Sequence, residues 1–462
     1  MKAFSLLIAA TLLTTAVSAN DSYKSKEKLD EEVLIISDGS TESVVYQFSS
    51  PERVKEHIRE REYETERTKQ IAIAQLASLR PSGFQSTDSP LFVMTQKDNK
   101  FAFAVGGYIA LTSSYDFCGV VENADFVTAD IPIPGDYSTK QQLMMDASTS
   151  RVYLHGVANS CAVGPIEVYI DADFRGSTGY SSSGVTNSYK PRVRTAYVKL
   201  LGFTMGRDIT TFCDLDAAPT TIDFQGPNAY SFNYATLLRY TYTSCNEAFS
   251  AALALEQPNV SGTYSTTFEA IPQRMPDVPM YVQFRLGRNL QHHLRLSGVV
   301  RNMYMYNSTT NDNISLLGWG AKLSGRLQPD PVVGLCFNAT YGEGITNYIQ
   351  DLNGLGLDFT PDPTNYAHMQ TMPMWAWQAA LNFNISERLT ANGGYSTVKV
   401  QKNNGYYSDN QYRSGEYIFG NLFYMVTPRF ALACEYIYGD RRNMNCMTNS
   451  ANRASLMAKF SF

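Results

Sequence analysis

The sequence predicts an all-β protein: a transmembrane antiparallel β-barrel of about 16 strands, preceded by a short periplasmic helical segment. Three observations support this fold class. The chain ends in an alternating, strand-like segment that stops on an aromatic residue. It begins with a short apolar export signal. Between these ends it contains strand-length segments that are joined alternately by short and long connections.

Residues 454–462 alternate in polarity as a β-strand does. One face carries Ala454, Leu456, Ala458, Phe460 and Phe462, because successive side chains of a strand point to opposite sides. A membrane barrel needs its last strand to pair with its first, since that pairing removes the open edge. The ending resembles the signal that the barrel-assembly machinery reads in bacterial outer-membrane proteins, so Phe460 and Phe462 are expected to contact that machinery. An ordinary edge strand that ends in Phe is the alternative.

Residues 1–19 have the pattern of a secretory signal peptide. Lys2 supplies the positive charge, residues 6–13 the apolar stretch and residues 17–19 the small residues of a cleavage site. The apolar stretch is too short to cross a bilayer as a helix, and no other stretch approaches the ~20 apolar residues that such a helix needs. No Cys follows the cleavage site, so a lipid anchor is not expected. We therefore predict an exported protein that meets outer-membrane lipid only as a barrel.

The composition agrees with a barrel and excludes several other classes. The chain has 31 Gly, 30 Tyr and 24 Phe but only 18% charged residues, as expected where lipid-facing side chains alternate with polar ones. A formal net charge of −5 argues against binding to nucleic acid, because a protein that binds nucleic acid needs a basic patch or stripe. The seven Cys are an odd number without metal-site spacing, so neither a disulfide framework nor a metal or other cofactor is expected.

The region before the barrel has two parts. Residues 20–50 are polar and irregular, which predicts a flexible lead-in. Residues 51–80 interleave acidic and basic side chains at helical spacing, with pairs such as Glu52 and Glu56, and the only Pro before residue 80 is its first residue. We predict a charged periplasmic helix there. Its apolar residues are too sparse for a heptad seam, so a plain spacer and a helix that assembles subunits as a coiled coil both stay open.

Residues 95–462 are predicted to form the barrel, because segments near the ~9–11 residues of a tilted transmembrane strand recur throughout. The expected strands are 101–109, 151–157, 165–174, 192–200, 203–212, 234–242, 248–255, 280–288, 293–304, 316–327, 332–342, 375–385, 389–400, 416–426, 430–439 and 454–462.

The connections between these segments differ in length in a regular way. Short, turn-like joints are expected at 160–164, 244–247, 289–291, 328–331, 386–388 and 427–429. Long polar joints are expected at 112–150, 175–191, 214–233, 259–278, 343–374, 401–415 and 441–452. Outer-membrane barrels have short periplasmic turns and longer extracellular loops. The pattern therefore places both chain ends on the periplasmic side.

Charged side chains within the strands are expected to face the lumen, because a charge on the lipid face costs ~2–4 kcal/mol near the bilayer midplane. The basic candidates are Arg192, Arg194, Arg207, Arg239, Arg285, Arg295, Arg301 and Lys322. The acidic candidates are Glu167, Asp171 and Asp173, which share a face of one strand, and Glu435 is another. Two interpretations stay open. The arginines form a ladder that attracts anions along a water-filled path, or the opposite charges pair and fill the lumen with a hydrated network.

The third long connection contains apolar residues that a loop in water would not need, namely Leu215, Ile222 and Phe224. A loop folded into the lumen would bury them and present three acidic candidates for a constriction. These candidates are Asp214, Asp216 and Asp223. A loop packed on the barrel rim is the alternative.

This part of the chain resembles the DcaP-like family of trimeric outer-membrane porins. The matching residues are Gly206, Phe212, Asp214, Asp216, Ala217, Pro219, Thr221, Asp223, Phe224, Gly226, Pro227 and Asn228. Arg207 departs from the Gln that the family usually has there. The resemblance implies a sixteen-stranded barrel, a homotrimer, a periplasmic N-terminal helical segment that can form a coiled coil, and diffusion of small anionic solutes such as dicarboxylates.

These observations favour a passive outer-membrane porin that prefers small anions. The competing hypothesis is a closed structural or adhesive barrel whose long extracellular loops bind partners. An enzyme is not expected, because the five His residues form no evident constellation with a nucleophile. They are His57, His155, His292, His293 and His368.

Overall fold

The structure is a computed structural model that describes residues 33–36, 44–47, 92–95, 101–120, 124–160, 163–176 and 189–462. The chain divides into two compact units, Met1–Ile71 and Ala72–Phe462. In the first unit, β1 (Val33–Ile36) pairs antiparallel with β2 (Val44–Gln47), inside the segment predicted to be a flexible lead-in. The predicted signal peptide and the predicted charged helix at 51–80 lie outside the described residues.

The second unit is a closed antiparallel barrel. Within its described part, sixteen long strands pair each with the next, as predicted. They are β4 (Phe101–Cys118), β6 (Arg151–Ser160), β7 (Gly164–Asp173), β8 (Arg192–Leu200), β9 (Phe203–Ile209), β10 (Tyr234–Thr243), β11 (Phe249–Glu256), β13 (Val278–Leu286), β14 (His292–Asn307), β15 (Asp312–Leu327), β16 (Val333–Glu343), β19 (Pro373–Asn384), β20 (Leu389–Val400), β21 (Tyr412–Thr427), β22 (Phe430–Asn443) and β23 (Thr448–Ser461).

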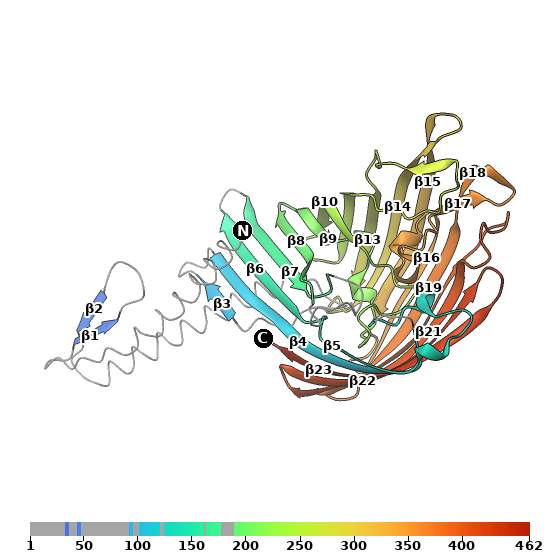
Figure 1. The fold of residues 1–462 in the computed structure, drawn as a ribbon. Coiled ribbons are helices and arrows are strands. Elements are labelled where there is room, and N and C mark those ends of the chain that lie inside the picture. The colour runs from blue at the N-terminus through green and yellow to red at the C-terminus, as the bar shows by residue number, and fades with distance from the viewer. Residues whose placement is uncertain are drawn as a thin grey trace. The chain divides into compact units, whose positions relative to one another are not determined.

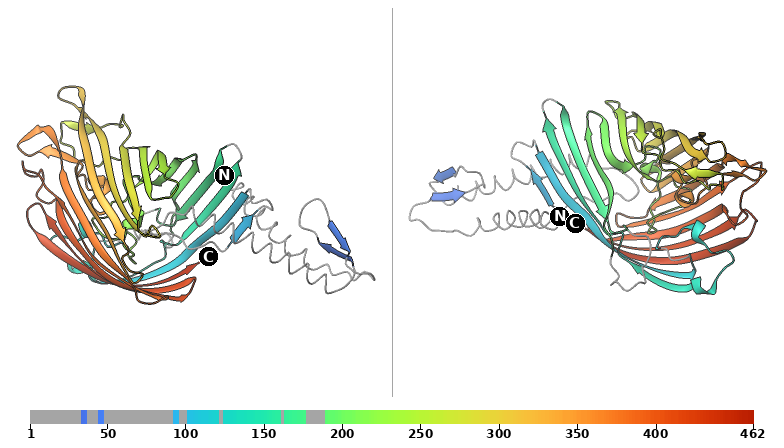
Figure 2. Two further views of the ribbon diagram at one scale, coloured as in Figure 1. Left: turned by 180° about the vertical axis from the view of Figure 1, so that it is seen from behind. Right: turned by 45° about the horizontal axis from the view of Figure 1, so that its top comes forward.

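The last strand closes the barrel against the first. β23 pairs antiparallel with β4, with Phe460 opposite Ile109, and Phe462 exchanges two backbone hydrogen bonds with Gly107. Figures 1 and 2 show the blue strand β4 beside the red strand β23. Nearer the N-terminal end of β4, its edge is covered by the short strand β3 (Phe92–Thr95), which pairs with residues 102–105. The prediction that the final segment is the closing strand is confirmed.

The turns at one end of the barrel are short, as the sequence predicted. β8 and β9 are joined by Leu201 and Gly202, both with positive φ (49° and 82°), the geometry of a two-residue type I′ hairpin turn. The other end differs from the prediction. Two connections that were expected to be long, 401–415 and 441–452, shrink to 401–411 and 444–447, because β21, β22 and β23 continue as paired strands beyond the length that the bilayer requires.

The strands bury alternate residues. On β13, Met280, Val282 and Phe284 face outward and are 38–50% exposed, whereas Gln283 between them is 3% exposed. An apolar outer face that alternates with a polar inner face is the pattern of a membrane barrel. No helix among the described residues is long and apolar enough to cross a membrane.

The long connections carry short elements of their own. These elements are the 3-10 turns η1 (Thr128–Asp130), η2 (Tyr137–Thr139), η3 (Leu215–Ala217), η4 (Thr346–Tyr348) and η5 (Gln350–Leu352), and the strands β5 (Lys140–Asp146), β12 (Phe268–Ala270), β17 (Phe359–Asp362) and β18 (Asn365–Thr371). A hydrophobic core forms where three of these connections meet the wall. It includes Val127, Phe212, Ile349, Met374 and Val398. Part of the lumen is therefore filled by packed, buried apolar side chains.

Candidate functional site

Residues 210–233, between β9 and β10, fold into the barrel and are called the lumen loop here. At its base, the Glu256 carboxylate accepts a hydrogen bond from the Thr210 hydroxyl and one from the Thr211 backbone N–H, each at 2.7 Å. Farther along, the Ser396 hydroxyl donates to the Asn228 side chain at 2.6 Å. Because these wall residues face inward, the lumen loop lies within the barrel and not on its rim.

Asp214 ties the first part of the lumen loop to the wall. It is 1% exposed, lies 3.1 Å from Nε2 of His293, and accepts a hydrogen bond from the Ser324 hydroxyl at 2.5 Å. Arg295 lies 3.8 Å from its other carboxylate oxygen. Burial opposes ionisation, but Arg295, His293 and Lys322 outweigh it and hold the pKa of Asp214 below its ordinary value. Asp214 is therefore a charged anchor and not a free group in the passage.

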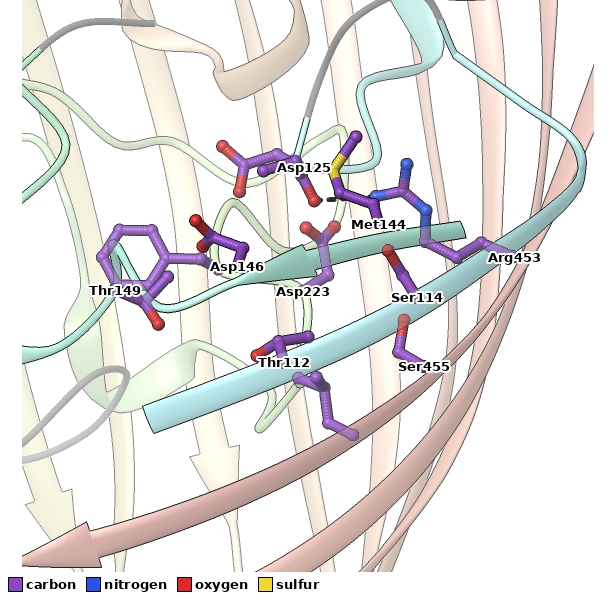
Figure 3. Close-up of a pocket in the computed structure, with 12 residues that line it drawn as sticks. Thr112, Ser114, Asp125, Met144, Asp146, Thr149, Asp223, Arg453 and Ser455 are labelled. Carbon is purple, nitrogen blue, oxygen red and sulfur yellow. Dashed lines mark hydrogen bonds between the residues drawn. The ribbon is translucent and has the colours of Figure 1, made fainter. Parts of the chain in front are cut away.

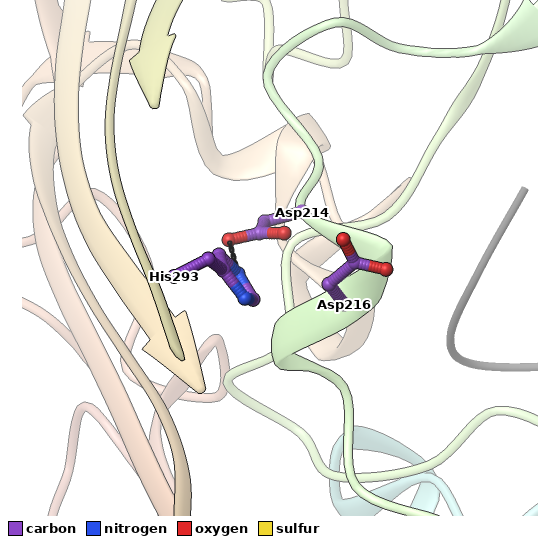
Figure 4. A group of neighbouring side chains, drawn as sticks. All are labelled: Asp214, Asp216 and His293. Carbon is purple, nitrogen blue, oxygen red and sulfur yellow. Dashed lines mark hydrogen bonds and ion pairs between the residues drawn. The ribbon is translucent and has the colours of Figure 1, made fainter. Parts of the chain in front are cut away.

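Asp216 lies next to this anchor, with an ion pair of 2.9 Å to Arg285. Figure 4 shows Asp214 and His293 turned toward each other with Asp216 beside them, and the candidate ligand atoms of the three residues lie within 4.8 Å of one another. Such a trio could in principle hold a metal ion. Here Arg285 and Arg295 already compensate the two carboxylates, so the donor set fits attachment of the loop better than capture of a cation.

Asp223 lies at the tip of the lumen loop. Its carboxylate accepts hydrogen bonds from the Phe126 backbone N–H at 3.2 Å and from the Tyr417 hydroxyl at 3.0 Å. Figure 3 shows it beside Asp125 and Arg453. Burial, together with the nearby charges of Asp125 and Glu435, raises the pKa of Asp223 well above its ordinary value. The hydroxyl and N–H donors hold this carboxyl in place, so it does not present a charge to a passing ion.

Phe224, the next residue, is clamped between two guanidinium groups. The ring centroid lies 4.9 Å from Arg175 and 5.1 Å from Arg194. Arg175 is itself fixed by a two-pronged ion pair to Asp125, at 2.7 and 2.6 Å. A cation over an aromatic face is attractive, and more so where water is excluded. The tip of the lumen loop is therefore held at the ends of β7 and β8 as well as on the opposite wall.

The space that the lumen loop leaves open is a cavity of about 670 Å³ along β6 to β14. Of the described residues, six basic side chains line it, namely Arg151, Arg194, Lys199, Arg239, Arg285 and Arg295. Three acidic side chains line it as well, namely Asp208, Asp216 and Glu247. The lining thus has a formal charge of +3, and tyrosines 169, 197 and 281 provide aromatic surface between the charges.

Several cavity arginines have fixed positions. Arg239 donates to Asp208 at 2.5 Å. Arg295 donates to the Gln283 side chain at 2.7 Å, and its guanidinium lies 4.1 Å from the Tyr281 ring centroid. Fixed donors stabilise a negative charge without the cost of reorganising around it. The Arg285 side chain, at 37% exposed, is the most accessible of the cavity arginines for which an ion pair is described.

The predicted acidic lumen residues are buried partners of basic groups. Asp171 accepts from Arg151 and lies 3.7 Å from Arg194. Asp173 accepts two hydrogen bonds from Arg192, at 2.9 and 2.5 Å. Glu167 lies 3.2 Å from His155 and 3.1 Å from the hydroxyl of Tyr197. Both interpretations of the charged ladder therefore describe part of the wall, since pairing uses the acids while several arginines still border the cavity.

Two predicted lumen residues are placed elsewhere. Arg301 is 1% exposed and lies 3.3 Å from Asp277 and 3.2 Å from Asp358. Lys322 is also 1% exposed, and its amine donates to the Phe212 carbonyl and to the Ser231 hydroxyl. Both point into the barrel, but inward-folded loops cover them. Strand alternation gives the side of the wall, whereas it gives no information on loops that fold over that side.

Arg207 also stays outside the cavity lining. Asp208 faces inward, and because alternate residues face opposite sides, Arg207 shares its face with Phe203 and Met205. Those two side chains are each 43% exposed on the outer wall. The Arg207 guanidinium lies 5.2 Å from the ring centroid of Tyr234. Of the eight predicted basic residues, the structure brings four to the cavity: Arg194, Arg239, Arg285 and Arg295.

Sequence reasoning missed some of the lining. Arg151 begins β6 and shares its face with Tyr153 and His155, opposite Val152 and Leu154. That alternation is visible in the sequence and could have identified Arg151. Lys199 and Tyr169 could have been found in the same way on their own strands. The carboxylate of Glu256 had no such signal, because its role depends on the return of the lumen loop.

Comparison with known proteins gives a consistent result. A family model described as DcaP outer membrane protein matches residues 75–462. The solved outer membrane channel DcaP of Acinetobacter baumannii superposes with a TM-score of 0.68 at 18% sequence identity, covering 80% of this chain and 100% of that chain. A loop-deletion mutant of OmpT, an outer membrane protein of Vibrio cholerae, gives 0.50 at 12% identity, with coverage of 79% and 100%. No curated protein matches the chain in sequence.

Proposed function

Since the chain belongs to the DcaP outer membrane protein family and is an outer-membrane channel without enzymatic activity, we propose that it passes small anions, dicarboxylates among them, by passive diffusion. The observation that supports this most directly is the charge of the cavity lining, six basic side chains against three acidic ones. A cavity lined mainly by one sign of charge concentrates ions of the opposite sign. A dicarboxylate carries two such charges and is attracted more strongly than a monoanion of equal size.

The contacts of the acidic residues in the lumen loop also support a preference for anions. Asp214 and Asp223 are held in buried anchoring contacts, and Asp216 is paired with Arg285. They therefore offset little of the positive charge along the passage. If these three carboxylates were free at the narrowest point, cations would be favoured instead.

The competing hypothesis is a closed structural or adhesive barrel. Its loops would fill the lumen completely and leave no continuous water path. The 670 Å³ cavity beside the lumen loop favours a channel, because a purely structural barrel does not need a polar space of that size. An electrical measurement separates the two hypotheses.

The test is single-channel current of the purified full chain in a planar bilayer, with a KCl gradient to obtain the reversal potential. The proposal predicts stepwise openings and a reversal potential on the anion-selective side. Proteoliposomes should also take up succinate faster than an uncharged solute of equal size. Cation selectivity would overturn the anion preference, and a chain that folds but never conducts would overturn the channel itself.

We further propose that the chain is a homotrimer that contacts its copies through the outer face of β6 to β8. The outward residues within the described part of these strands include no aromatic side chain, and the exposed Phe174 lies just beyond the end of β7. They are Val152, Leu154, Gly156, Ala158, Ile166, Val168, Ile170, Ala172, Val193, Ala196, Val198 and Leu200. Elsewhere the outer wall exposes Trp319, Tyr341, Trp377, Tyr424 and Tyr436. Aromatic girdles mark where a barrel meets lipid headgroups, so a face without them suits protein contact.

The remaining features of the proposal concern assembly. The barrel lies in the outer membrane, and the charged segment at 51–80 is proposed to be a periplasmic helix that precedes it. Phe460 and Phe462, at the end of the closing strand, are proposed to be read by the barrel-assembly machinery. Replacing both with Ala should slow insertion into the outer membrane, which pulse-labelling of the heat-modifiable folded form would detect.

A further inference from the structure

We propose that Glu435, held by a relay of three asparagines across the barrel wall, positions the tip of the lumen loop and so sets the width and the anion preference of the passage. This inference rests on the proposed function and names the residues that regulate its geometry. None of these four side chains borders the 670 Å³ cavity, so they would act through the loop.

The relay crosses four neighbouring strands. The amide of Asn382 on β19 donates to Asn392 on β20 at 2.7 Å, and Asn392 donates to Asn421 on β21 at 2.8 Å. Asn421 in turn donates to the carboxylate of Glu435 on β22 at 2.8 Å. The backbone register places these residues directly opposite one another. Each amide therefore donates in the same direction, which polarises the next bond in the chain and strengthens it.

The relay ends on the lumen loop. Glu435 is 4% exposed and accepts hydrogen bonds from the backbone N–H groups of Ile222 and Asp223, at 2.9 and 2.8 Å. Asn421 makes a second contact with the loop, since its side chain donates to the Thr220 carbonyl at 2.9 Å. Glu435 is thus the shared acceptor for two consecutive amides at the loop tip, one on each carboxyl oxygen.

The neighbouring residue connects this anchor to the passage. Phe224 follows Asp223 directly, and its ring lies between Arg175 and Arg194. Arg194 borders the cavity. If the tip left Glu435, Phe224 would leave the guanidinium clamp, Arg194 would lose one of its fixed contacts, and the tip would be free to enter the cavity. The position of the tip and the charge of the wall are therefore coupled through one aromatic ring.

If the relay served only the folding of the barrel, its side chains would not need this alignment. Inward-facing polar groups in a hydrated lumen can be satisfied by water, and three amides and a carboxylate on four adjacent strands need not be aligned. The alignment instead delivers a fixed donor to Glu435 and leaves its carboxylate free to accept from the loop. The wall partners are consequently arranged for the loop and not only for each other.

Two variants test the proposal, Glu435→Gln at the anchor and Asn392→Ala within the relay. The matched control is Glu416→Gln, which removes the same charge from an exposed residue on β21 that does not contact the lumen loop. Heat-modifiable migration of each variant confirms that its barrel has folded. The first readout is hydrogen exchange of the loop-tip amides by mass spectrometry, which requires no conductance.

In the Glu435→Gln variant, exchange at the Ile222 and Asp223 amides should accelerate by about tenfold or more, since the Gln side chain has one acceptor oxygen for two N–H groups and one hydrogen bond is lost. Open-channel current should become noisy with brief closures, and the reversal potential should move toward zero. Asn392→Ala should have the same effects to a smaller degree, and Glu416→Gln should have none.

The outcomes separate this inference from the proposed function. Unchanged exchange and unchanged current in both test variants would overturn the positioning role while leaving the porin intact. A wild type that never conducts would overturn the porin, and exchange would still decide whether Glu435 holds the tip. Faster exchange with unaltered noise and selectivity would show that the tip does not control the passage, which also refutes the inference.

Discussion

Reversing one charge in the cavity gives a quantitative test of the anion preference. Arg285→Glu changes the formal charge of the lining from +3 to +1 at an accessible position. A unit charge about 6 Å from an ion in water contributes about 0.7 kcal/mol, so reversal changes the interaction by about 1.4 kcal/mol. Screening at 0.15 M salt reduces this by roughly half, which leaves about a threefold effect on anions and the opposite effect on cations. The ratio of anion to cation permeability should fall by about tenfold.

The assay is the reversal potential of single channels in a KCl gradient, repeated at high salt where the difference should shrink. The matched control is Arg442→Glu, which makes the same charge change at an exposed position on β22 away from the cavity. If Arg285→Glu leaves the permeability ratio unchanged while the control behaves like the wild type, ions do not pass beside Arg285. The assignment of the passage to this cavity would then be wrong.

Three further predictions follow from buried contacts and from the outer wall. Arg301→Met should lower the free energy of unfolding by about 3–5 kcal/mol in a thermal melt, because it leaves Asp277 and Asp358 buried without their cation. Ile170→Trp should abolish the trimer band on a native gel, whereas Leu296→Trp on the outer face of β14 should not; loss in neither would place the interface elsewhere. Asp351, which accepts from the Thr128 hydroxyl, has its pKa raised to about 7 by burial, so the folded protein holds a proton that the unfolded chain has released. Stability should therefore fall as pH rises from about 4 to 7 and level off above, and calorimetry should show that Asp351→Asn removes this part of the pH dependence.

The number of strands and the closing pair could be predicted because both follow from local pattern. Alternation over 454–462 identifies a strand with one apolar face, and a barrel requires that strand to close on the first. The predicted bounds of the strands were less accurate at the end of the barrel that carries the long connections. β21 and β22 begin or end in polar residues such as Ser414 and Arg441, which suit a strand above the membrane as well as they suit a loop. Polarity alone does not distinguish the two.

The sequence predicts which side of the barrel wall a charged residue faces, but it does not predict whether a folded-in loop covers that residue. Arg239, Arg285 and Arg301 alternate with apolar neighbours in the same way, yet two of them border the cavity and the third is covered. What separates Arg301 is the return of distant connections that supply Asp277 and Asp358. Contacts between segments so far apart in sequence produce no local periodicity from which they could be predicted.

The distribution of acidic residues makes the proposed anion preference compatible with a net charge of −5. Selectivity depends on the charges that border the passage and not on the sum over the chain. Inside the barrel, Asp214 and Asp223 hold the lumen loop, and Asp171 and Asp173 orient wall arginines. Each carboxylate that serves as an anchor is withdrawn from the water path. An acidic loop can therefore narrow an anion passage, provided that its carboxylates are bound to the wall behind it.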